Sequence, residues 1–136
     1  NCMRVVKKIK VNTYNCSVLF VVTNEMGKSE KYLQKKYAKG TLVPGTPAEE
    51  AEGITITVSG NLYITMIDAK FLNHNVIAHE LYHATRRITE DRDITDEESS
   101  AWLMGFLSEE FYKFLSSDKV KKEFEKVDNQ DGGTTK

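Results

Sequence analysis

Apolar and polar residues follow two different periods along the chain, and the change of period separates strands from helices. Residues 5–11 alternate imperfectly between apolar side chains and lysine, whereas residues 18–22 are apolar without interruption. Alternation is typical of a strand with one solvated face, and an uninterrupted run is typical of a strand buried on both faces. We therefore expect an outer strand over Val5–Val11 and a buried strand over Val18–Val22.

Residues 29–39 have a helical pattern. Ser29 suits the N-cap of an amphipathic helix, and Gly40 suits its stop. One side of this helix carries Tyr32, Leu33, Lys36 and Tyr37. Both prolines of the chain lie within residues 40–53 together with three glycines. This composition predicts a loop, which we expect to be a plain connector, with a rim or lid for a site in the second half of the chain as the alternative.

Two strand-like segments, Ile54–Ser59 and Leu62–Ile67, are separated by Gly60-Asn61. A two-residue connection of this kind is typical of a tight β-hairpin. The first segment alternates cleanly, whereas the second is apolar on both faces. We therefore expect the second strand to be the more buried and the first to lie nearer an edge of the sheet.

The second half of the chain has helical periods. Start signals at Asn73 and Asn75 precede the first helix, and a polar run over Thr89–Asp93 ends it. Its apolar stripe, at 100° per residue, is formed by Ile77, Leu81, Ala84 and Ile88. A second helix opens at Asp96 and continues to Leu115. A final helix is predicted from the spacing of Val120, Phe124 and Val127.

These segments together predict an α+β fold in one domain over residues 1–127. We expect a small mixed or antiparallel sheet with a hairpin, packed against the first helix of the second half and the C-terminal helices. At 136 residues the chain is long enough for one hydrophobic core and short for two. The polar, glycine-containing residues 128–136 predict a frayed tail.

Composition argues against two classes of partner. The 19 basic and 20 acidic residues give a net charge of −1, which provides no broad positive field for nucleic acid. No segment approaches the roughly 18–20 apolar residues of a membrane span, and no secretory signal pattern is visible. Neither a nucleic acid nor a membrane partner is expected, and a cytoplasmic location is the default. Cys2 and Cys16 lack CxxC spacing, so they are free thiols or one disulfide.

The chemistry is concentrated in His79-Glu80-Leu81-Tyr82-His83, the pattern HExxH. Residues four apart on a helix lie one above the other, so the imidazoles of His79 and His83 can converge on one zinc ion. Both point almost to the side opposite the apolar stripe, and Glu80 lies between that side and the stripe. Glu80 is therefore the candidate general base that acts on an attacking water.

A catalytic zinc site requires a third protein ligand. The acidic run Asp96-Glu97-Glu98 opens the next helix, and we favour Glu98 as the ligand, with Glu97 as the alternative. Helix capping also accounts for this run, because Thr95 and Glu98 fit a capping box and acidic groups favour a helix N-terminus.

His79-Glu80-x-x-His83 followed by Glu98-x-x-Ala101-Trp102 resembles the minimal gluzincin-type zinc peptidases, in particular the small ImmA/IrrE-like and phage-encoded HExxH proteins. The resemblance covers about residues 54–115. It implies a zincin-like fold, one catalytic Zn²⁺ bound by His79, His83 and Glu98, and Glu80 as the general base. These 136 residues are too few to hold the extra domains of IrrE-like proteins as well, and they contain no cysteine-rich zinc ribbon of the kind typical of SprT-like peptidases.

The function implied is zinc-dependent hydrolysis of a peptide or protein substrate. By the same resemblance, the hairpin is expected to offer an exposed strand on which extended substrate pairs. The candidates for a donor to the tetrahedral oxyanion are Tyr63, Tyr82 and His74, with Tyr112 more distant. Two alternatives stay open, namely a non-catalytic zinc-containing protein-binding module that keeps the peptidase fold and a metal-free interaction protein. The sequence does not determine the oligomeric state.

Overall fold

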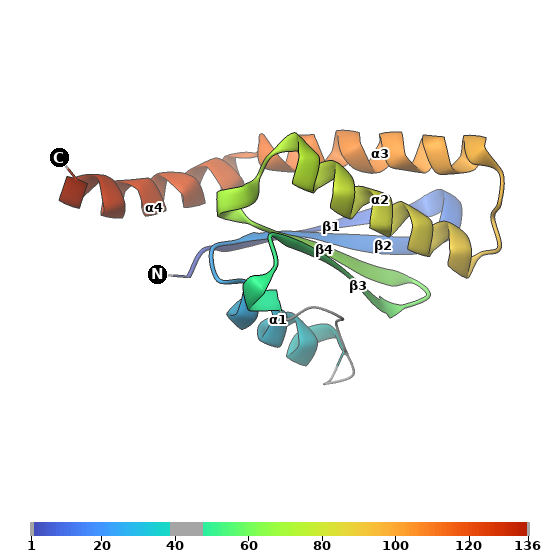
Figure 1. Cartoon of the computed structure of the whole chain (residues 1–136), viewed down its shortest axis with the longest axis horizontal. Helices are drawn as coiled ribbons and strands as arrows, with labels where there is room; N and C mark the ends of the chain where they lie inside the picture. Colours follow the sequence, from blue (N-terminus) through green and yellow to red (C-terminus); the bar gives the residue numbers. More distant parts are fainter. Residues whose placement is uncertain (1, 39–47, 136) are drawn as a thin grey trace.

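A computed structural model describes residues 2–38 and 48–135 of the chain, with side chains as far as Asp128 (Figure 1). The strands in this part of the chain are β1 (Arg4–Val11), β2 (Cys16–Thr23), β3 (Gly53–Ser59) and β4 (Leu62–Asp68). The α-helices are α1 (Met26–Leu33), α2 (His74–Asp91), α3 (Glu97–Leu115) and α4 (Asp118–Thr135). The α+β class expected from the sequence is confirmed.

The strands form one mixed sheet with the order β1-β2-β4-β3. β2 pairs with β1 in antiparallel orientation and with β4 in parallel orientation, and β3 and β4 form the antiparallel hairpin. The apolar strands β2 and β4 are central, and the strands that alternate with polar residues, β1 and β3, lie at the edges. The hairpin, the outer first strand and the edge position of β3 therefore agree with the sequence pattern.

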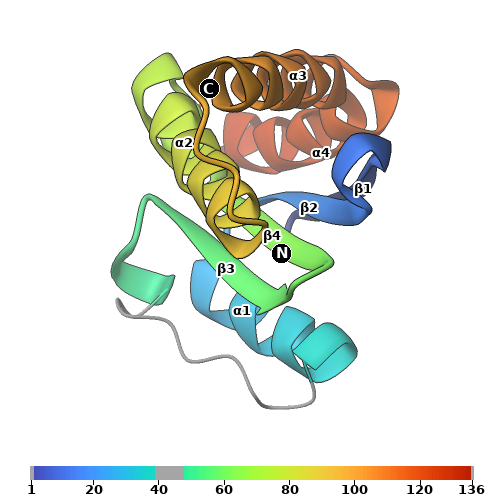
Figure 2. The ribbon, with the colours of Figure 1, turned by 90° about the vertical axis from the view of Figure 1, so that its right-hand side faces the viewer.

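Helices cover the two faces of the sheet unequally (Figure 2). α2 and α3 pack over one face, with α4 at their end, and α1 and the turn over residues 48–50 pack on the other. The core under α2 and α3 includes Phe20, Tyr63, Leu81, Ile88, Leu103 and Phe111. The core under α1 includes Leu19, Val21, Leu33, Ile56, Ile64 and Met66. The large apolar layer therefore supports α2, the helix with the HExxH residues.

The first helix differs from the sequence prediction at its start. α1 begins at Met26, and Ser29 is a buried residue inside it rather than the N-cap. The Ser29 hydroxyl lies 2.7 Å from that of Thr23 and accepts a hydrogen bond from Arg4 Nε at 2.9 Å. A π-helical turn over Gln34–Ala38 follows. Tertiary hydrogen bonds therefore override the local capping preference of this serine, and residues 39–47 of the predicted helix end and loop lie outside the described residues.

The C-terminal helices extend further than the apolar pattern. The N-cap of α3 is Asp96, whose side chain accepts from Ser99 N at 2.8 Å, so Thr95 does not form the capping box. The α4 backbone is helical to Thr135, so residues 128–135, predicted as a frayed tail, continue this helix. Extension of an existing helix costs far less than nucleation. No helix in the described ranges combines the length and apolar character needed to cross a membrane.

Both cysteines are free thiols, which decides between the two sequence-based alternatives. Cys2 is exposed, whereas Cys16 is buried, and burial raises the pKa of its thiol.

Hydrogen bonds of Tyr63 connect the hairpin to the C-terminal end of α2. Its hydroxyl donates to Asp91 Oδ2 at 2.5 Å and accepts from Arg92 Nη1 at 3.1 Å, while Arg92 Nη2 donates to Gly60 O at 2.5 Å. Burial of the hydroxyl is the larger cause and the hydrogen bond to Asp91 the smaller one; together they raise the pKa of Tyr63 to about 12. The hydroxyl therefore stays protonated at physiological pH, and its hydrogen bonds link β4 to the C-terminal end of α2.

Candidate metal centre

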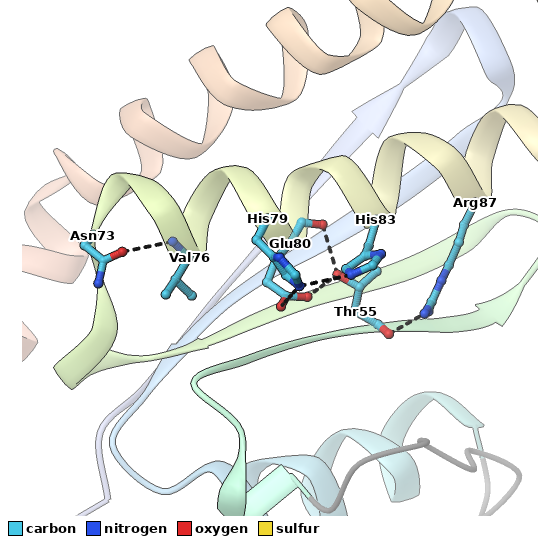
Figure 3. Close-up of polar contacts among 7 residues, drawn as sticks. All are labelled: Thr55, Asn73, Val76, His79, Glu80, His83 and Arg87. Atoms are coloured by element: carbon cyan, nitrogen blue, oxygen red, sulfur yellow. Dashed lines mark hydrogen bonds and ion pairs between the residues drawn. The ribbon is translucent and has the colours of Figure 1, made fainter.

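α2 presents one face to the core and another to a groove beside β3. Its N-cap is Asn73, as predicted, and the Asn73 side chain accepts from Val76 N at 2.9 Å (Figure 3). The predicted apolar stripe is buried, at 3 % exposure or less, and comprises Ile77, Leu81, Ala84 and Ile88. Because this stripe fixes the rotation of the helix, His79 and His83 are directed outward along the groove.

The imidazoles of His79 and His83 converge. Their Nε2 atoms are 3.1 Å apart, and the ring planes are inclined by 83°. Two nitrogens bound to a tetrahedral zinc at about 2.0–2.1 Å would lie roughly 3.3 Å apart. The pair therefore fits a zinc ion with little adjustment, although a hydrogen bond between two neutral rings also explains the spacing.

Glu80 is buried, at 5 % exposure, and is held in position by β3. The hydroxyl of Thr55 donates to Glu80 Oε1 at 2.8 Å and lies 3.0 Å from the Glu80 carbonyl oxygen (Figure 3). The other carboxylate oxygen, Oε2, lies 3.9 Å from His79 Nε2. One oxygen is thus anchored to the sheet, and the second faces the imidazole pair.

Gly53 provides the space in which Glu80 lies. A Cβ at this position would be 2.8 Å from Glu80 Cγ, 3.2 Å from Val76 Cγ1 and 3.3 Å from Glu80 Cδ. The first distance is shorter than real contacts allow. Any side chain on this residue therefore displaces Glu80 or separates β3 from α2.

We expect Gly53→Ala to displace Glu80 from Thr55 and to lower the free energy of unfolding by about 1–3 kcal/mol, as overpacking does. Chemical denaturation measures this change. Gly105→Ala is the matched control, because nothing lies within 4 Å of a Cβ there and alanine is the better helix former, by about 1 kcal/mol. Equal stability of the Gly53→Ala variant and the wild type would show that Glu80 is not held as described.

A cavity of about 650 Å³ lies between β3 and the outward face of α2. Its wall from α2 includes His79, Glu80, His83 and Arg87, and its wall from the sheet includes the β3 residues Gly53 to Thr57. This volume suits a short segment of peptide or a small molecule. His79, His83 and the candidate base Glu80 therefore share one open cavity with an edge strand.

Glu98 does not lie beside the imidazole pair. α3 runs antiparallel to α2 (Figure 1), and the contact of Thr85 Oγ1 with Met104 Sδ, at 3.6 Å, fixes their relative level. Glu98 is thereby about 12 Å from His83 along the helix axes, at 1.5 Å per residue. Glu97 and Glu98 are exposed in the first turn of α3. In the part of the chain described, no three His, Cys, Asp or Glu side chains are grouped closely enough to hold a metal.

The candidate oxyanion donors also lie outside the cavity wall. Tyr63 is committed to Asp91 and Arg92. Tyr82 is half-exposed and accepts from Arg86, and His74 Nδ1 lies 2.5 Å from the Tyr112 hydroxyl. Each of these groups therefore has a partner elsewhere in the fold.

Sequence reasoning missed three residues of the cavity: Gly53, Thr55 and Arg87. Their roles depend on the packing of β3 against α2, for which the sequence pattern provides no signal beyond the alternation of β3. Comparison of the chain with protein-family models, curated proteins and solved structures finds no match.

Proposed function

We propose that this protein is a zinc-dependent peptidase with a zincin-like fold, in which His79 and His83 bind the metal and Glu80 is the general base. The observation that carries the proposal is the 3.1 Å separation of the two Nε2 atoms, next to a buried carboxylate in an open cavity. Zinc, when bound, would supply Lewis-acid chemistry that polarises a carbonyl and lowers the pKa of the attacking water.

The protein's own groups perform the proton transfer. The hydrogen bond from Thr55 to Oε1 orients the Glu80 carboxylate, so Oε2 is the oxygen that accepts the proton of the attacking water. The same carboxyl group then donates this proton to the amine that leaves when the peptide bond breaks. The fixed position of Glu80 reduces the reorganisation that each transfer requires.

The substrate we propose is an extended peptide that pairs with β3. This strand is at the edge of the sheet and lines the cavity with the candidate ligands. Extended peptides add to such edges through main-chain hydrogen bonds, and adjacent pockets select side chains. A non-catalytic zinc-containing module is the second candidate, favoured by the distance of Glu98 from the imidazole pair.

The direct test combines metal content with activity. Protein purified without added metal is expected to contain one zinc per chain and to cleave unfolded casein, and a chelator should abolish the cleavage. Zinc without cleavage would support the binding module instead. Absence of both would leave the metal-free interaction protein as the explanation.

The third ligand stays a prediction from the sequence. For Glu98 to bind zinc, the first turn of α3 must approach the imidazole pair. In the part of the chain described, Glu97 and Glu98 are exposed and form no ion pair that would keep this turn away from the pair.

We expect Glu98→Gln to weaken zinc binding at least tenfold, roughly the lower bound for losses around a metal site. Isothermal titration measures the affinity, with Glu97→Gln as the matched control. Equal affinities for Glu98→Gln and the wild type would remove Glu98 from the ligand set.

A further inference from the structure

Arg87 lies on the same face of α2 as the imidazole pair, one turn beyond His83 (Figure 3). It lines the same cavity. Helical side chains lean towards the N-terminal end of their helix, so the guanidinium extends back in the direction of Glu80. There Nη1 donates a hydrogen bond of 2.6 Å to the carbonyl oxygen of Thr55, the residue whose hydroxyl anchors Glu80.

The Thr55 carbonyl belongs to the open edge of the sheet. Asp68 N donates to Glu52 O at 2.9 Å, and hydrogen-bonded pairs alternate with non-hydrogen-bonded pairs along an antiparallel ladder. The pairing of Thr55 with Thr65 falls on a non-hydrogen-bonded position. The main-chain groups of Thr55 therefore point away from β4. Arg87 thus lies at the edge on which an added peptide strand would pair.

The charge of Arg87 has no counterpart in the described part of the chain. Its guanidinium is partly buried, makes one hydrogen bond there and forms no ion pair. The neighbouring arginines differ, because Arg86 pairs with Glu90 and Tyr82, and Arg92 donates to four oxygen atoms. A partly buried cation without a counter-charge is costly unless a ligand provides one.

We infer that Arg87 binds a carboxylate of the substrate. A guanidinium has five N–H donors in a planar fork that matches a carboxylate in a bidentate manner, and only one of the five is used by Thr55. The inference rests on the proposed function for the identity of the substrate as a peptide. The carboxylate is then either the peptide's C-terminus or an Asp or Glu side chain, at the end of the segment that pairs with β3.

The test measures binding by metal-free protein, so its result is independent of peptidase activity. Three probes are titrated and followed by NMR at the Thr55 amide and the Arg87 Nε–H group: N-acetyl-trialanine with a free C-terminus, its C-terminal amide, and an N-acetyl Ala-Asp-Ala amide. We expect at least one of the two acidic probes to shift both signals and the neutral amide to bind at least tenfold more weakly. The acidic probe that binds identifies the source of the carboxylate.

Arg87→Gln is expected to remove the preference for the acidic probe, and Arg87→Lys to restore only part of it, because lysine keeps the charge without the fork. Arg86→Gln is the matched control and should leave binding unchanged, since Arg86 is exposed and outside the cavity wall. Equal binding of acidic and neutral probes by the wild-type protein, or no binding of either acidic probe, overturns the inference. Because the three probes are compared on the wild-type protein, the inference can be tested even if a variant fails to fold.

Discussion

Glu80→Gln is expected to retain zinc and to lower kcat/KM for peptide cleavage by about 10²–10⁴-fold, the usual contribution of a general base. Glutamine has nearly the shape of glutamate, and its side-chain oxygen can still accept the hydrogen bond that Thr55 gives to Oε1. The position that Oε2 occupies, 3.9 Å from His79 Nε2, would then hold an amide nitrogen that cannot accept a proton. The change removes the proton transfer with little disturbance of the packing.

The measurement pairs kcat/KM with elemental analysis of the same preparation. Glu90→Gln is the matched control, because Glu90 is an exposed carboxylate of α2 that pairs with Arg86 and does not line the cavity. It should cleave at the wild-type rate. Unchanged cleavage by Glu80→Gln would reject Glu80 as the base, whereas loss of zinc from this variant would assign Glu80 a role as a ligand.

The parts of this molecule that could be predicted from the sequence are those determined within one segment. Gly60-Asn61 between two strand patterns identifies the hairpin, and Asn73 identifies the start of α2. The relation of His79 to His83 follows from the geometry of one helix and is found as expected. Local periodicity and turn chemistry are therefore sufficient for these features.

The parts that could not be predicted depend on how distant segments meet. Ser29 has the chemistry of an N-cap, but its hydroxyl is used by Thr23 and Arg4 across the fold. The position of Glu98 depends on the loop between α2 and α3, which sets the level at which the two helices contact each other. The sequence shows that Glu98 has a carboxylate, but it does not show at which height along α2 this residue lies.

The same limit applies to the walls of the cavity. Thr55 reads as an ordinary alternating residue of an edge strand, yet it contacts Glu80 through its hydroxyl and Arg87 through its carbonyl. Both contacts require β3 to lie beside α2. The candidate residues could be listed from the sequence, whereas the orientation of their side chains is a property of the packed sheet and helix.

His79→Ala is expected to lose stoichiometric zinc. One of two converging nitrogens is removed, and His83 alone is a poor site because zinc in proteins normally has three or four ligands. The affinity should fall by more than about 100-fold, since even changes to groups that only orient ligands cost 10–100-fold. Zinc should also raise the midpoint of thermal unfolding of the wild type, because a ligand that binds only the folded state stabilises it, and this increase should be absent from the variant.

His74→Ala is the matched control for this experiment. The chain has three histidines, and His74 lies against Tyr112 of α3 rather than in the cavity. Its removal takes away the same chemical group from the same helix, so any general effect of losing an imidazole appears in both variants. If the metal is bound by the pair, only His79→Ala loses it. Stoichiometric zinc in His79→Ala, or equal loss from both variants, would contradict a metal centre on the outward face of α2.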